Sequence, residues 1–148
     1  MPGVLEIDWS EVIAHLTKLA VAFALTLPIG LDREGVRAGP GVRTFPLVAV
    51  GSCGYILMGQ SLFLDEGSQA RLLYGLMTGI GFIGGGSILK EHGNISGTAT
   101  AASIWNVGAI GAAVAWQRFE IALVLAFANF ATLRWLGHAF GTKEESSR

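Results

Sequence analysis

A glycine-rich segment, TGIGFIGGGSILK at residues 78–90, has a spacing that is also found in nucleotide-binding loops. Gly79, Gly81 and Gly84 fit the pattern G-x-G-x-x-G, and Lys90 ends the segment as the lysine of a phosphate cradle would. That chemistry requires a preceding strand, a helix that begins at the glycines, and an acidic residue about 20 positions later. The elements around the segment decide whether these conditions hold.

A second group of residues able to act chemically lies in the stretch GLDREGVRAGPGVRT, residues 30–44. Its carboxylates and arginines favour charge-assisted hydrogen bonds between two segments of the chain. Carboxylates in this position could also meet a hydrated Mg²⁺ ion, although the stretch carries more arginines than acids. The simpler alternative is a set of charges that anchors helix ends. The candidate residues are Asp32, Arg33, Glu34, Arg43 and Thr44.

Sets of residues typical of catalysis or of metal binding do not emerge from the sequence. The histidines His15, His92 and His138 and the single cysteine, Cys53, lack the spacing of metal ligands. No serine has a suitable histidine and aspartate at the same expected depth. We therefore expect neither an enzyme nor a bound cofactor.

The composition explains where these groups lie. Of the 148 residues, 51% are hydrophobic and 14% are charged, well below the roughly 25% charged residues of soluble domains. The net charge of −1 gives no basic field for nucleic acid, so the expected surroundings are the lipid bilayer. The sequence predicts an all-α, polytopic membrane helix bundle that forms one domain over residues 1–148.

The charged residues divide the chain into five apolar stretches, each close to the roughly 20 residues that span the hydrocarbon core. A polar tail follows at 141–148. Because the acidic start of the chain lacks the basic region of a signal peptide, we expect the first stretch to be retained in the membrane. The five expected helices are about 12–31, 44–64, 70–89, 97–116 and 119–140.

The distribution of basic residues predicts the orientation. They gather in the first and third connections and after the fifth stretch, and this side is cytoplasmic by the positive-inside rule. With five spans, the N-terminus is outside and the C-terminus is cytoplasmic.

The glycine-rich segment then lies inside the third expected helix, without a preceding strand, so the nucleotide-binding interpretation fails. In lipid, glycines four residues apart let two helix backbones approach, and the fourth helix is a suitable partner. Alternatively, a helix broken at Gly84–Gly86 could line a polar cavity or pore. The glycines concerned are Gly75, Gly79, Gly81, Gly84, Gly85 and Gly86.

Four polar residues lie at membrane depth in the fourth and fifth helices. Hydrogen bonding between helices is one interpretation, and a path for a solute or an ion is the other. These residues are Thr100, Ser103, Asn106 and Asn129.

Three blocks, GLDREGVRAGPGVRT (30–44), GIGFIGGGSILK (79–90) and SGTATAASIWNVGAIG (96–111), together resemble the MgtC/SapB family of bacterial inner-membrane proteins. Ser96 and Phe45 depart from the arginine and histidine that are frequent in that family. Many members continue into a cytoplasmic C-terminal domain, so the resemblance implies a short member that lacks it.

The resemblance implies a multi-pass protein of the inner membrane with a regulatory or adaptor role, linked to magnesium-limited growth, virulence and control of membrane ATPases. The implied partners are a second copy, with a dimer favoured, and other membrane proteins such as an ATPase. The alternative is a transporter or channel for Mg²⁺ or another small solute, and a purely structural role is a third interpretation. Five short helices could line a path only as an oligomer or with broken helices, and the sequence predicts no ring of acids at membrane depth.

Overall fold

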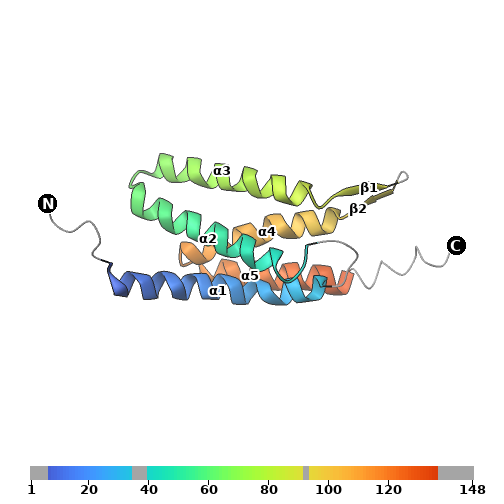
Figure 1. The fold of residues 1–148 in the computed structure, drawn as a ribbon, viewed down its shortest axis with the longest axis horizontal. Helices are drawn as coiled ribbons and strands as arrows, with labels where there is room; N and C mark the ends of the chain where they lie inside the picture. Colours follow the sequence, from blue (N-terminus) through green and yellow to red (C-terminus); the bar gives the residue numbers. More distant parts are fainter. Residues whose placement is uncertain (1–6, 35–39, 92–93, 137–148) are drawn as a thin grey trace.

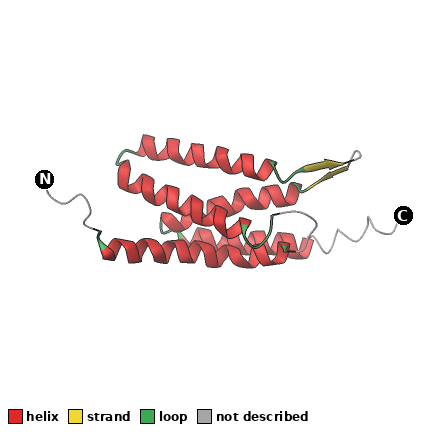
Figure 2. Ribbon diagram, in the orientation of Figure 1, coloured by secondary structure: helices red, strands yellow, loops and turns green. Residues whose placement is uncertain are grey.

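A computed structural model of the chain describes residues 7–34, 40–91 and 94–136. It confirms the helix bundle, as Figure 1 and Figure 2 show. The helices are α1 (Trp9–Arg33), α2 (Thr44–Leu62), α3 (Glu66–Gly85), α4 (Thr98–Ala115) and α5 (Phe119–Ala131), and α5 continues into a π-helical turn, η1 (Thr132–Leu136). The predicted end of the last helix, at 140, and the predicted polar tail lie outside the described residues.

Helix α4 forms the centre of the bundle and packs against the other four helices. Its sequence suits this position because alanine and glycine let neighbouring backbones approach closely in a membrane. An added side chain at Gly111 would overlap the carbonyl group of Ala49 in α2, and one at Gly108 would overlap Ile80 in α3. Figure 1 shows α3 and α1 on opposite sides of the molecule. The small residues of α4 therefore set the spacing of the bundle.

The third helix and the segment after it differ from the prediction. Helix α3 begins at Glu66 because the carboxylate of Asp65 accepts a hydrogen bond from the Ser68 amide at 2.7 Å and caps the first turn. Hydrogen bonds from Ser68 hold the pKa of Asp65 below its ordinary value. The helix ends at Gly85, where the Ser87 hydroxyl donates to the Gly84 carbonyl at 2.6 Å.

A short antiparallel hairpin follows α3, and the all-helical prediction did not include it. Strand β1 (Leu89–Glu91) pairs with β2 (Asn94–Ser96) in the register Leu89 to Ser96. Gly97 has a φ of +83° and begins α4, and a side chain there would overlap the Ser87 carbonyl. The glycine-rich segment therefore leads into a hairpin, and α3 is neither continuous to residue 89 nor resumed after a break.

Within the described residues, four helical segments are long and apolar enough to cross a membrane: α1, α2, α4 and the continuous segment Phe119–Leu136. Helix α3 does not meet the same criterion and contains Glu66, Gln69 and Arg71 in its first two turns. The structure thus supports a membrane bundle, whereas five spans and the outside position of the N-terminus stay predictions.

Candidate functional site

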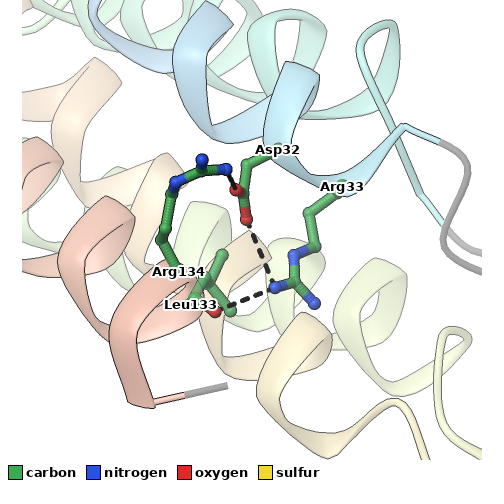
Figure 3. Close-up of polar contacts among 4 residues, drawn as sticks. All are labelled: Asp32, Arg33, Leu133 and Arg134. Carbon is green, nitrogen blue, oxygen red and sulfur yellow. Dashed lines mark hydrogen bonds and ion pairs between the residues drawn. The ribbon is translucent and has the colours of Figure 1, made fainter. Parts of the chain in front are cut away.

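Asp32 is the centre of a polar cluster at the carboxyl end of α1. Its side chain is only 7% exposed. The carboxylate accepts a hydrogen bond from Arg134 Nη1 at 3.1 Å and one from Arg33 Nη2 at 3.4 Å, as Figure 3 shows. Arg134 comes from η1, so these ion pairs join the ends of the first and last helices. We call Asp32, Arg33 and Arg134 the Asp32 cluster.

Arg33 connects the cluster to the backbone of the last helix. Its Nη2 also donates to the Leu133 carbonyl oxygen at 3.1 Å. The last carbonyls of a helix lack intrahelical partners, and a cation near them is favourable. Within the described chain, the buried Arg33 Nε has no hydrogen-bond partner. With two guanidinium groups and one carboxylate, the Asp32 cluster carries a net positive charge.

Lys18, also on α1, makes a similar contact with the carboxyl end of a different helix. Its Nζ donates to the Ala115 carbonyl oxygen, at the end of α4, at 3.4 Å. Helix α1 therefore supplies a cation to the carboxyl ends of two other helices, which favours their alignment along α1.

Glu34 stabilises the connection between α1 and α2 by a hydrogen bond to its backbone. Its Oε2 accepts a hydrogen bond from the Val42 amide at 2.8 Å. Gly41 makes room for this carboxylate, because a side chain there would overlap Glu34. A Cβ atom at Gly30 would lie 2.9 Å from Val42 Cα, so this glycine lets the returning chain lie against α1.

One interpretation of residues 30–44, an ion pair of Arg43 with an acid across the first two helices, is not observed among the described residues. Arg43 is exposed and forms no ion pair with any described acidic residue. Its backbone precedes α2, and Thr44 begins that helix without joining the Asp32 cluster. The residue that fills the expected role is Arg134. Its sequence signal was a single arginine near the expected cytoplasmic end of the fifth helix.

The side chains of two of the four intramembrane polar residues, both asparagines, hydrogen-bond between helices. Asn106 Nδ2 donates to the Leu125 carbonyl oxygen and Asn129 Nδ2 to the Ser103 carbonyl oxygen, each at 3.3 Å. Both bonds join α4 to α5. The Ser103 hydroxyl is buried without a partner among the described residues, and Thr100 is half-buried.

We expect Asn129→Ala to lower the free energy of unfolding by about 0.5–2 kcal/mol, because hydrogen bonds between membrane helices contribute about that much. Thermal unfolding in detergent measures the change. Thr100→Ala is the matched control, since no side-chain hydrogen bond of Thr100 occurs within the described residues. Equal stability of the two variants would contradict the contribution of Asn129.

The glycines of α3 divide into those that pack within the chain and those that do not. At Gly84 a Cβ atom would lie 3.0 Å from the Ala101 carbonyl oxygen, so α3 lies close to α4 there. Gly86 closes the helix, and a Cβ atom there would lie 3.3 Å from the Ile83 carbonyl oxygen. The expected packing against α4 is wrong for the glycines that would meet no other atom within 4 Å, which are Gly75, Gly79, Gly81 and Gly85.

The acids, histidines and cysteine of the described residues do not gather into a metal site. No group of three or more histidines, cysteines or acids that could hold a metal ion occurs in residues 7–34, 40–91 and 94–136. Asp32 already forms ion pairs with two arginines. The geometry is that of a connection between helices.

Comparisons with known proteins relate residues 19–140 to the MgtC family. MgtC of Brucella abortus (strain 2308) is 37% identical over 103 residues, covering 70% of this chain and 43% of that protein. SrpB of Synechococcus elongatus is 33% identical over 129 residues, covering 78% of this chain and 71% of SrpB. The putative magnesium transporter YhiD of Escherichia coli (strain K12) is 33% identical over 121 residues, covering 77% of this chain and 55% of YhiD. The chain thus spans less than half of the Brucella protein and about half of YhiD. No solved structure matches.

Proposed function

The chain belongs to the MgtC family, and from this premise we propose that it is a regulatory or adaptor protein of the bacterial inner membrane in magnesium-limited growth and virulence. It catalyses no reaction and acts by contacts between helices, with a second copy and with other membrane proteins such as an ATPase. The link to magnesium is supported by the name of the relative YhiD, a putative magnesium transporter.

The outward face of α3 is the observation that carries the adaptor role. Ile80 of α3 is buried against the bundle and Leu76 is half-buried, whereas Phe82, Ile83 and Met77 are exposed. Among these exposed apolar residues, the outward face of α3 also carries glycine and polar groups. Glycine on a membrane helix favours contact with another helix. The exposed residues along one line of this face are Tyr74, Thr78, Gly81 and Gly85, which we call the adaptor face.

Transport of Mg²⁺ is the second candidate, favoured by the name of YhiD, a putative magnesium transporter. A permeation path for a divalent cation would need oxygen ligands at membrane depth. The centre of this bundle around α4 consists mainly of alanine, glycine, valine and isoleucine. Asp32 is also neutralised by arginine. Both observations favour the adaptor role over transport.

The decisive test combines growth with flux. In a strain that requires the protein at low magnesium, the double variant Gly81→Leu and Gly85→Leu should insert and fold normally but fail to support growth. An added Cβ atom at Gly81 or Gly85 meets no other atom within 4 Å, so we expect the new side chains to obstruct a partner and not the bundle. Gly54→Leu on α2, where an added Cβ atom also meets no other atom within 4 Å, is the control and should support growth.

Flux separates the two candidates. Purified wild-type protein in proteoliposomes with an internal Mg²⁺-sensitive dye should give the same signal as protein-free vesicles. Protein-dependent uptake that Asp32→Asn abolishes would establish transport and overturn the adaptor role.

A further inference from the structure

A groove of about 770 Å³ opens between α2 and α3. Figure 1 shows these two helices joined at one end by a short turn and diverging toward the other. Apolar side chains such as Leu47, Leu76 and Ile80 line the walls, Arg71 lies toward the α2–α3 turn, and Thr44 lies at the opposite end. The groove follows α2, which is long and apolar enough to cross a membrane, so it lies at the depth of the hydrocarbon chains.

Nothing in the described chain fills this groove. Glycines on both walls keep it open, because a Cβ atom at Gly51, Gly75 or Gly79 would meet no other atom within 4 Å. The Ser52 hydroxyl bonds back to the Val48 carbonyl oxygen at 2.7 Å, so it offers no donor to an occupant. Polar groups free to bind an occupant therefore concentrate toward the ends, which suits a hydrocarbon chain with a polar head.

Arg71 gives the groove one cationic end. Its Nη2 donates to the Ser68 hydroxyl at 2.9 Å, and the guanidinium forms no ion pair with any described acid. The side chain is exposed, in the second turn of α3. A guanidinium group can bind two oxygens of one phosphate, which makes arginine a frequent phosphate ligand. Arg71 is the charged residue among those that line the groove, Asp65 interacts with it electrostatically from outside the groove, and its guanidinium group complements an anionic head.

We propose that the α2–α3 groove binds an acyl chain of an anionic phospholipid, with the lipid phosphate on Arg71. The groove supplies apolar area along about three turns of each helix, and Arg71 fixes the depth of the head. This site does not rest on the adaptor role and uses a different face of α3. A second copy of the chain seated in the groove is the competing occupant.

The test is native mass spectrometry of the purified, delipidated full chain with added phosphatidylglycerol or phosphatidylcholine. Wild-type protein should retain phosphatidylglycerol more strongly. Arg71→Gln should weaken its binding about tenfold and remove the preference for the anionic lipid, since charge-assisted hydrogen bonds carry energies of that order.

Filling the groove tests its position. Gly51→Leu and Gly75→Leu should each weaken phosphatidylglycerol binding about tenfold or more, because the added side chain occupies the space of the acyl chain. Gly54→Leu, on the same helix as Gly51 but outside the groove, should bind lipid like the wild type. Unchanged binding in both groove variants overturns the proposal. Loss of a dimer with lipid binding intact would assign the groove to a second copy instead.

Discussion

Asp32→Ala is expected to lower the free energy of unfolding by about 3–5 kcal/mol, because it leaves buried positive charge without its partner. The Asp32 side chain is 7% exposed and that of Arg33 is 17% exposed, so water does little to replace the carboxylate. The connection between the first and last helices is lost as well. Thermal unfolding of the purified protein in detergent measures this effect.

Two variants show whether charge or exposure controls the result. Asp32→Asn keeps an oxygen acceptor for the arginines but not the charge, so its stability should fall between those of the wild type and Asp32→Ala. Arg118→Ala removes an ion pair with Glu120 in which both side chains are 62% exposed, and it should change little. A loss in Asp32→Ala as small as that in Arg118→Ala would show that the Asp32 cluster is only an interfacial anchor.

The bundle could be predicted because hydrocarbon thickness restricts the length of apolar runs. The fourth helix was expected over 97–116 and is observed at Thr98–Ala115, while the second was expected over 44–64 and is observed at Thr44–Leu62. The hairpin β1–β2 could not be predicted, since strands of three residues are too short to show alternation. The turn into α4 depends on the positive φ of Gly97. The sequence does not indicate which of its many glycines adopts a positive φ.

The polar site was predicted in part. Asp32 and Arg33 were identified because charges at the end of an apolar run need partners, and the structure places them together. Arg43, which is near in sequence, was the candidate partner, whereas the observed partner Arg134 lies 102 residues from Asp32. Only the packing of the bundle brings α1 and η1 together. A single sequence indicates the depth at which a residue lies in the membrane, but it does not indicate which helices pack against each other.

The glycines of α3 show the same limit of prediction from the sequence. The pattern of α3 suggested close packing at Gly79 and Gly85, yet both face open space in the chain. Among the helical glycines, the closest approach to the backbone of another helix involves Gly111, where α4 meets α2. Spacing of small residues indicates that some face allows close contact, but the direction of that face depends on the position of neighbouring helices. Substitution by alanine can distinguish the two kinds of glycine.

Gly111→Ala is expected to destabilise the protein by about 3 kcal/mol or more, at or above the upper end of the usual cost of overpacking. The added methyl group would overlap the Ala49 carbonyl, which belongs to a helix backbone and cannot move aside as a flexible side chain can. The two central helices, α2 and α4, would have to separate along their contact. Gly79→Ala should instead be neutral or stabilising by up to about 1 kcal/mol, because alanine favours a helix over glycine and no neighbour opposes it. Thermal unfolding of both variants in the same detergent gives the comparison. Equal stabilities would mean that α2 and α4 are not in backbone contact at Gly111, and the central position of α4 would then be wrong.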